Sequence, residues 1–360
     1  MLLACTKNQR YQQSIKIKFK YDFMPPFISV IIIAYNRKQF ILDAIKSVQQ
    51  QTLNAALYEI IVIKNFKDKK IDGYINKSGI KNVYLSPAIA CGIGYKAITG
   101  AKMAKGKVIC FLEDDDLFDR NKLKVVYKFF HNNKVGLYHN AKYVLYKNKI
   151  INKHYIDVKS KFEVDLSKKL GKDVKMKFLD PTAQLGNNSS LAIKKDIIKF
   201  KTLKKVKLAF DAALIISALA SEYNLIFDNK VLTIYRIHES NFSIDKALDY
   251  DNFIKKWQKL SEQNYLDWIK LRSIHINDKS IDDLIYQNFL LQKLNYLVYA
   301  KRARKAVHFV NSVKFVYINL KYGNLNKKVI ERIVIALIFL ISPKFVKRLF
   351  YFAQFKKAKF

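Results

Sequence analysis

The chain has 360 residues, half of them hydrophobic and 14% aromatic, which excludes wholesale disorder and suffices for one large domain with an appendage or two modest domains. Lys and Arg number 66 against 29 Asp and Glu, so the net charge of +37 attracts polyanions such as nucleic acid, anionic lipid or phosphorylated substrates. Because lysine is spread along the whole chain, a compositional bias explains this charge equally well, and the charge alone selects no partner.

The cysteines and the first residues of the chain indicate in which cellular compartment we expect the protein. Cys5, Cys91 and Cys110 have neither paired spacing nor nearby His ligands, which argues against a zinc site or a disulfide framework. The apolar start ends at Ala4, unlike a signal peptide, and no stretch reaches the roughly 18 apolar residues that span a bilayer. We therefore expect a cytoplasmic protein.

Residues 27–130 show strand and helix patterns in alternation. Predicted strands cover 28–34, 59–63, 82–85 and 108–112, and helical patterns cover 40–48 and 92–105. The first strand is a continuous β-branched run, typical of a strand buried on both faces. This alternation predicts a Rossmann-like, mostly parallel α/β sheet flanked by helices, which binds ligands at the carboxyl ends of its strands.

The rest of the chain divides into further predicted parts. Residues 131–245 form a less regular half with strands at 135–146, 189–193 and 231–236 and a buried helix at 208–222. Residues 246–328 form a helical extension, and 329–360 an apolar and basic tail. Residues 1–26 are a basic extension without apolar periodicity, so we expect them to be mobile.

Four consecutive acids, Glu113 to Asp116, directly follow the strand that ends at Leu112. Side by side they repel one another, and hard divalent cations such as Mg²⁺ or Mn²⁺ bind carboxylate oxygens together with substrate phosphates. The alternative is a solvated acidic turn that caps a helix starting near Asp119. The position at the end of a buried strand favours the metal site.

Several of these segments together resemble the family-2 glycosyltransferases of the GT-A fold. Residues 28–37 read ISVIIIAYNR, similar to the family's usual opening SVIIPTYNR. The segments SVQQQT at 47–52 and EIIVI at 59–63 match the next helix end and strand, and Gly92, Gly94 and the acid cluster match its glycine pair and acidic motif. The resemblance covers about 28–125 and resumes over about 186–243.

This resemblance implies inverting, metal-dependent sugar transfer from a nucleotide-diphospho-sugar and assigns site residues. Glu113 and Asp115 are the two acids of the DxD motif, and Asp115, Glu113 and Asp116 are expected to hold Mg²⁺ or Mn²⁺. The implied nucleotide-sugar site comprises Ala34, Tyr35, Asn36, Arg37, Asn65, Gly94, Glu113 and Asp114. The family's base-reading aspartates are replaced here by Lys64 and Asn65, of which only Asn65 can accept a hydrogen bond.

The second half supplies the expected catalytic base. Asp211 stands alone among apolar residues, where burial would raise its pKa towards that of a general base; the alternative is an N-cap of a helix over 212–222. The segment from Tyr235 to His238 resembles the family's Y-R-x-H pattern. His238 is then expected at the metal or diphosphate, and Arg236 at the diphosphate; a lone His is as often structural.

The tail points to a membrane surface. Ile333–Ile341 is apolar but too short to span a bilayer, so it is either a buried core helix or an interfacial element. Lys344, Lys347 and Arg348 alternate with aromatic and aliphatic residues, typical of interfacial attachment. We expect a peripheral protein on the anionic inner face of the cell membrane, with a glycan or lipid-linked acceptor.

Two other function classes are compatible with parts of the sequence. A nucleotidyltransferase would use a metal and a nucleotide in the same way, but the chain has neither a G-x-G-x-x-G nor a P-loop motif. A basic nucleic-acid- or membrane-binding protein without catalysis would explain the charge but not the acids at a strand end. We expect no nucleic-acid partner, because the sequence has no RNA- or DNA-binding signature.

Overall fold

The computed structural model describes residues 25–87, 92–131, 134–146, 149–152, 160–168, 171, 187–238, 249–302, 304–322 and 327–357. Most of the predicted basic extension, 1–24, lies outside these residues, as do Cys5 and Cys91. Cys110 is buried with a free thiol.

The first half folds as the sequence predicts. Its elements are β1 (Ile28–Ala34), α2 (Ile41–Gln49), β2 (Tyr58–Lys64), α3 (Lys69–Lys77), β3 (Lys81–Tyr84), α4 (Ile93–Met103) and β4 (Val108–Glu113). The strands lie in the order β3-β2-β1-β4 and are all parallel. Helix α3 was not predicted; Asp68 caps it by accepting hydrogen bonds from the backbone N–H groups of Lys70 and Ile71.

The second half continues the same sheet with mixed strand directions. Its elements are β5 (Leu117–Phe118), α5 (Lys122–His131), β6 (Val135–Tyr146), β7 (Lys149–Asn152), β8 (Phe162–Val164), β9 (Leu191–Lys194), α7 (Phe200–Leu203), α8 (Phe210–Leu219) and β10 (Asn224–Ile237). Strand β9 is antiparallel to both β4 and β6, whereas β10 is parallel to β6. The sheet order is β3-β2-β1-β4-β9-β6-β10-β5. The predicted fold class, a mostly parallel α/β sheet with flanking helices, is confirmed.

Three predicted boundaries in this half are wrong. The strand expected at 189–193 begins only at Leu191, because Asn188–Ser190 forms a 3₁₀ turn. The helix expected at 208–222 is shorter, since it begins at Phe210 and ends at Leu219. The strand expected at 231–236 is the last part of the longer strand β10. Bulges between Asp228 and Thr233 shift the register, and β10 stays paired with β6 on both sides of them.

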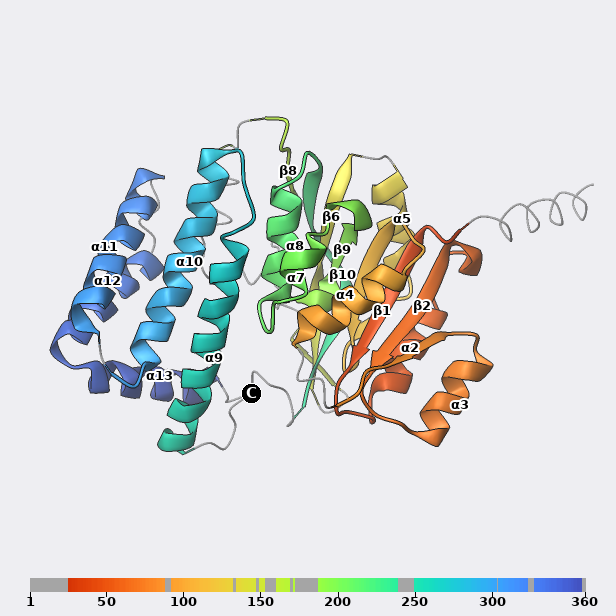
Figure 1. The fold of residues 1–360 in the computed structure, drawn as a ribbon, viewed down its shortest axis with the longest axis horizontal. Coiled ribbons are helices and arrows are strands. Elements are labelled where there is room, and N and C mark those ends of the chain that lie inside the picture. Colours follow the sequence, from red (N-terminus) through yellow and green to blue (C-terminus); the bar gives the residue numbers. More distant parts are fainter. Residues whose placement is uncertain are drawn as a thin grey trace, which may run out of the picture.

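Helices cover both faces of the sheet (Figure 1). Along β1, Ile31 and Ile33 pack with α4 and α8 on one face, while Val30 and Ile32 pack with α2, α3 and α5 on the other. Helix α4 lies very close to the sheet: a Cβ on Gly100 would come within 2.6 Å of the Ile31 Cγ2 atom. The sheet is therefore held between two helical layers and forms a firm support for the residues at its carboxyl edge.

The C-terminal region is helical, as predicted. It consists of α9 (Tyr250–Leu271), α10 (Lys279–Tyr299), α11 (Lys305–Lys321), α12 (Lys327–Ile341) and α13 (Pro343–Lys357). Trp268 of α9 and Leu284 of α10 belong to the same core cluster as α4 and α8. Helices α11 and α12 lie farthest from the sheet in Figure 1. The C-terminal helices thus form a layer beside the sheet domain and share part of its core.

The alternative that the tail packs as part of a core holds in part, and its attachment to a membrane stays a prediction. Phe339 of α12 and Val346 of α13 are buried in a cluster with Phe253, Val298 and Tyr299 of α9 and α10. Other apolar side chains of the same helices, such as Leu337 and Ile341, are exposed. Over its described residues the chain contains no helix that combines the length and the hydrophobicity needed to cross a bilayer.

Candidate functional site

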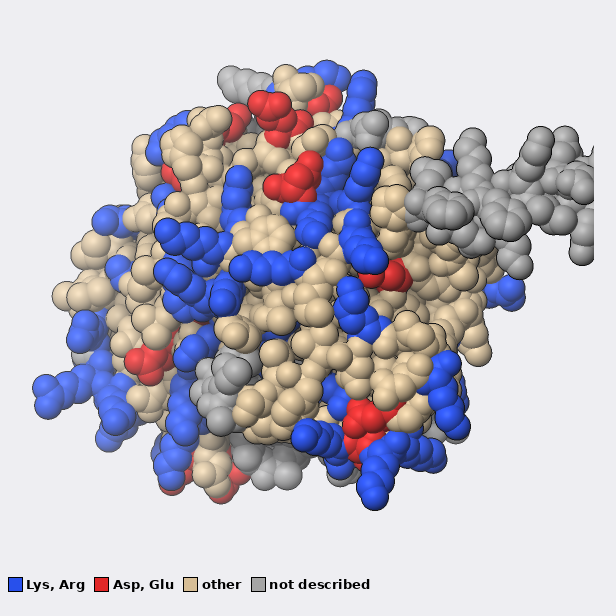
Figure 2. All heavy atoms as spheres, turned by 45° about the vertical axis from the view of Figure 1, so that its right-hand side comes forward, with Lys and Arg blue, Asp and Glu red and all other residues tan. Residues whose placement is uncertain are grey.

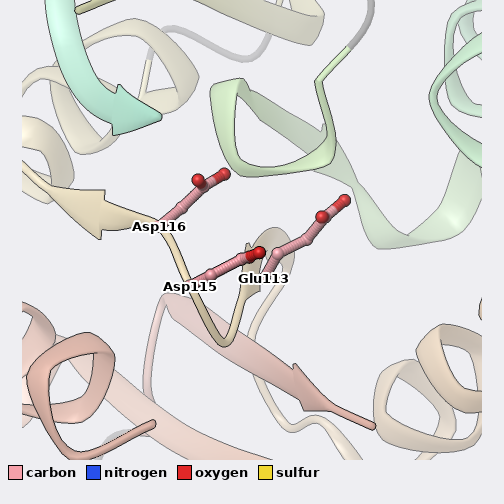
Figure 3. A group of neighbouring side chains, drawn as sticks. All are labelled: Glu113, Asp115 and Asp116. Carbon is pink, nitrogen blue, oxygen red and sulfur yellow. The ribbon is translucent and has the colours of Figure 1, made fainter. Parts of the chain in front are cut away.

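The predicted acid cluster lies in a tight turn at the carboxyl end of β4. The backbone N–H of Asp116 donates to the carbonyl oxygen of Glu113 at 3.2 Å and closes the turn. Carboxylate oxygens of Glu113, Asp115 and Asp116 lie within 4.8 Å of one another. Figure 3 shows these three side chains leaving one turn, with Glu113 and Asp116 directed towards the segment around residues 187–190. The turn therefore concentrates negative charge at the edge where α/β sheets bind ligands.

The electrostatics of this turn favour an added cation. Burial raises the pKa of Glu113 and Asp116, and the neighbouring carboxylates raise both further. Burial also raises the pKa of Asp114 to about 6, even though Arg37 opposes the rise. Since the ionised forms are disfavoured without compensation, the turn gains most from a proton or a bound cation.

Arg37 supplies part of this compensation. Its Nη2 atom lies 2.5 Å from Asp114 Oδ1, and its Nη1 atom lies 2.6 Å from Asp115 Oδ2. His238 Nε2 lies 3.0 Å from the same Asp115 oxygen. The carboxyl ends of β1, β4 and β10 therefore meet at Asp115.

The backbone before Arg37 is fixed by a pair of asparagines. Asn36 has a positive φ of 58°, a conformation that Asn tolerates better than most residues. Its N–H donates to Asn65 Oδ1 at 2.8 Å, and Asn65 Nδ2 donates to Asn36 Oδ1 at 2.7 Å. Asn65 thus links the ends of β1 and β2. Lys64 points away from this link and pairs with Asp72 at 2.7 Å.

Two buried oxygens beside the acids have no hydrogen-bond partner among the described residues. These are Asp115 Oδ1 and Asn188 Oδ1. Asn188 Nδ2 donates to Glu113 Oε1 at 2.7 Å, so the amide lies against the cluster. Buried polar atoms are rarely left unpaired, and oxygen-only ligands suit Mg²⁺ or Mn²⁺. The residues present therefore fit a hard divalent cation.

A buried lysine holds the 188–190 turn against the acids. Lys122 is completely buried and donates to the Ser189 carbonyl oxygen and, at 3.0 Å, to Thr233 Oγ1. Ser189 Oγ accepts from the Glu113 N–H at 3.0 Å, and Asn187 Nδ2 donates to Asp116 Oδ2 at 3.3 Å. Lys122, Thr233 and the turn at 187–190 were not predicted as parts of the site. The polar run at 187–190 was a visible signal, whereas Lys122 is one lysine among many.

Arg236 and His238 lie beside the acid cluster at the end of β10, and their roles at a metal or diphosphate stay predictions. The Arg236 N–H donates to Asp116 Oδ1 at 3.1 Å, and its Nε donates to the Asp115 carbonyl oxygen at 3.1 Å. Its Nη2 lies 3.1 Å from Asp43 Oδ2. The ring of Phe40 lies between the two, with 4.4 Å to the Arg236 guanidinium and 4.8 Å to the His238 ring. Arg236 therefore braces the acid turn against α2.

Asp211 lies in the first turn of α8. The alternative that it caps this helix is wrong, because the N-cap position belongs to Ala209 and the helix begins at Phe210. Asp211 Oδ1 accepts from the Ala212 N–H at 2.7 Å. Burial raises the pKa of Asp211, and the neighbouring Lys142 on β6 opposes the rise. Its assignment as the base stays a prediction.

The remaining predicted residues lie around the same strand ends. Ala34 is buried at the end of β1, and the exposed ring of Tyr35 lies under Lys96, with 3.4 Å from Nζ to the ring centre. Gly94 is buried against a backbone turn, where a Cβ would come within 2.1 Å of the Leu203 carbonyl oxygen. This contact alone requires glycine at 94, so the predicted role of Gly94 in binding is not needed to explain it.

Residues 29–192 match the family model of Glycosyl transferase family 2. A segment of 119 residues is 35% identical to an uncharacterized glycosyltransferase of Rickettsia conorii, covering 29% of this chain and 17% of that protein. An uncharacterized glycosyltransferase of Methanocaldococcus jannaschii is 25% identical over 225 residues, 59% of this chain and 71% of that protein. The chain therefore spans less than a fifth of the length of the Rickettsia relative.

Solved structures show the same fold over most of the chain. S. aureus TarS 1–349 in complex with UDP superimposes with a TM-score of 0.57 at 15% identity and covers 92% of both chains. The mannosyltransferase PcManGT of Pyrobaculum calidifontis, in complex with GDP-Man and Mn²⁺, gives a TM-score of 0.50 at 11% identity over 89% of both chains. At these identities the likeness establishes the fold alone. Residues 29–192, a little under half of the chain, therefore match glycosyl transferase family 2 in sequence, and the chain as a whole has a GT-A-like fold.

Proposed function

We propose that this protein transfers a sugar from a nucleotide-diphospho-sugar to a hydroxyl or phosphate acceptor, with Mg²⁺ or Mn²⁺ as cofactor. One observation carries the proposal: Glu113, Asp115 and Asp116 converge at the end of β4 beside two unpaired oxygens, Asp115 Oδ1 and Asn188 Oδ1. This arrangement lies inside the segment that matches the family. A cation bound there would offset the negative charge that develops on the departing nucleoside diphosphate.

The chain's own residues suit the donor. Arg37 pairs with Asp114 and Asp115, and its side chain is partly exposed to solvent. When a cation neutralises the acids, this guanidinium is free to contact diphosphate oxygens, for which its planar fork is well shaped. Arg236 adds positive charge beside the same turn, and His238 lies against Asp115. Asn65 is proposed to bond the base through the lone pair or the N–H of its amide that Asn36 does not use.

Asp211 is the proposed base for the acceptor hydroxyl. Burial raises the pKa of Asp211. A carboxylate removes a proton more effectively when its pKa lies nearer to the pH at which the enzyme works. Attack from the face opposite the leaving group would invert the anomeric centre, as the family resemblance implies. The acceptor is proposed to be a glycan or a lipid-linked sugar at the inner face of the cell membrane, because the chain is strongly basic and its last helices expose apolar side chains.

A donor panel tests the proposal. The full chain is incubated with nucleotide-sugars that include UDP-GlcNAc and GDP-mannose, with Mn²⁺ or with EDTA, and release of the nucleoside diphosphate is measured. We expect release from one donor, lost in EDTA and restored by Mn²⁺. Pyrophosphate release from nucleoside triphosphates with a sugar phosphate would instead indicate a nucleotidyltransferase. No release from any donor, together with nucleic-acid binding, would support the non-catalytic alternative.

A further inference from the structure

Helix α11 is oriented with its polar side inward. Its buried residues are mostly polar: His308, Asn311, Ser312, Phe315, Ile318 and Asn319. Beside three lysines, six large apolar or aromatic side chains are exposed on it: Val307, Phe309, Val310, Val313, Tyr317 and Leu320. A surface helix of a protein surrounded by water has the opposite arrangement.

The inward polar groups of α11 are satisfied locally. Asn311 Nδ2 donates to the Val307 carbonyl oxygen at 2.6 Å, and Ser312 Oγ donates to the His308 carbonyl oxygen at 2.9 Å. The His308 ring stacks on Phe339 of α12 at 4.3 Å. The stacking on Phe339 turns the side of α11 that carries His308 towards α12, and the apolar side of α11 points outward.

The apolar surface continues onto the next two helices. On α12, Ile330, Val334, Leu337 and Ile341 are exposed and follow one another at helical spacing. On α13, Phe345, Leu349 and Phe352 are exposed. We call these three sets, on α11, α12 and α13, the outer apolar face. It comprises thirteen exposed large apolar side chains on three consecutive helices, whereas ordinary surfaces carry such side chains singly.

Positive charge accompanies this face. Residues 301–360 contain 15 Lys and Arg and a single acid, Glu331. Lys305, Lys314 and Lys321 on α11 and Lys344 and Arg348 on α13 are exposed. Two copies of the chain joined through this face would bring two basic surfaces together, whereas an anionic bilayer would attract them. The positive charge therefore favours an anionic bilayer over a second copy of the chain as the partner of this face.

We propose that the outer apolar face lies on an anionic lipid bilayer, with the side chains of α11, α12 and α13 inserted among the lipid headgroups and the basic residues paired with lipid phosphates. This extends the proposed membrane location from the tail to α11, which sequence alone placed in an ordinary helical extension. The arrangement is that of a helical surface lying in the membrane interface, with no helix crossing it.

Vesicle binding by the full chain tests this proposal. Sedimentation is measured with phosphatidylcholine vesicles and with vesicles that contain about a third phosphatidylglycerol. Val313→Glu on α11 and Leu337→Glu on α12 change residues that are 52% and 51% exposed. The matched control is Leu266→Glu on α9, where the leucine is 44% exposed outside the face.

We expect binding to the anionic vesicles, weakened by salt, and a loss of roughly tenfold or more in Val313→Glu and Leu337→Glu. Lys314→Gln should weaken binding by about fivefold, the usual value of one basic residue near such a surface. The Leu266→Glu control should bind like the unchanged protein. Equal melting temperatures of all four variants would exclude unfolding as the cause.

Two results would overturn the proposal. One is vesicle binding that is unchanged by both Val313→Glu and Leu337→Glu. The other is a dimer in light scattering that Val313→Glu dissociates, without any vesicle binding, which would assign the face to a second copy. Because binding is measured without donor, a chain that binds vesicles but turns over no nucleotide-sugar contradicts only the proposed function.

Discussion

The sheet domain and the C-terminal helices differ in what they bury and what they expose. At the carboxyl edge of the sheet, charged side chains such as Asp116 and Lys122 are buried next to the apolar core. In α11 and α12, apolar side chains such as Val313 and Leu337 are left in contact with solvent. Both departures are unfavourable for an isolated chain in water. Each points to something bound: a cation and an anionic donor in the first region, lipid in the second.

The largest expected effect is a difference in stability between variants on the buried side and on the exposed side of α12. Phe339 is completely buried and Leu337, two residues earlier, is half exposed. Phe339→Ala should lower the free energy of unfolding of the helical region by about 3–5 kcal/mol, because it leaves a cavity. Leu337→Ala should change it by less than about 0.5 kcal/mol. Denaturant unfolding measures both, and equal losses would contradict the assignment of the two faces.

Asp115→Asn should lower turnover of the nucleotide-sugar by roughly a hundred- to a thousandfold, because it removes the carboxylate at which the β1, β4 and β10 ends meet. The fold should persist, since the residue lies in a turn after the strand. Asp196→Asn, at an exposed acid beyond β9, is the matched control and should leave turnover unchanged. Full turnover of Asp115→Asn in excess EDTA would exclude a metal at this site.

Asp211→Asn should lower transfer to the acceptor by about a hundredfold, the usual effect of losing a general base. Donor binding should change little, because Asp211 lies on α8 and not in the β4 turn. Calorimetric titration with the nucleoside diphosphate, beside the transfer assay, separates the two effects. A collapse of donor affinity would assign Asp211 to the nucleotide site or to the core.

A smaller effect concerns pH. The buried acids of the turn have raised pKa values, with Asp114 at about 6, so the folded state binds their protons more tightly than the unfolded state does. Stability should therefore fall as pH rises from about 4 towards 8, the range between the unfolded and folded pKa values of these acids, lowering the melting temperature by a few degrees. Lys122, whose pKa is lowered to about 7 by burial, acts in the opposite direction at higher pH.

Mn²⁺ provides the control for this pH dependence. A bound cation favours the ionised carboxylates, so saturating Mn²⁺ should flatten the fall in melting temperature. In Asp115→Asn the same addition should have a much weaker effect. If Mn²⁺ leaves the melting curves of the unchanged protein unaltered at every pH, the acids do not form a cation site.

The sequence predicted the parts of the fold that local pattern determines. The β-branched run of β1 and the acids after β4 were visible as segments, and the parallel direction of the first strands followed from their alternation with helices. Helix α3 was missed because its sequence is rich in lysine and carries only two buried apolar residues, Ile71 and Ile75. The contacts of Asn188 and Lys122 join residues more than 60 positions apart, which no local pattern encodes.

The orientation of α11 was unpredictable for a related reason. Its outward side is more apolar than its inward side, so the usual rule that the apolar side of a helix faces the core gives the wrong orientation. The stacking of His308 on Phe339, a residue of another helix, decides the matter. Similarly, Asp211 was compatible with a cap or a base until the helix start at Phe210 excluded the cap.

A crystal structure of the protein with Mn²⁺ and a nucleoside diphosphate tests the central claim most directly, because anomalous scattering locates the manganese. We expect one ion within about 2.0–2.3 Å of an Asp115 oxygen and of diphosphate oxygens, close to Glu113, Asp116 and Asn188. Arg37 should have left Asp115, now 2.6 Å away, for the diphosphate. Manganese bound elsewhere, or an Arg37–Asp115 pair that persists beneath a bound nucleotide without metal, would contradict the account.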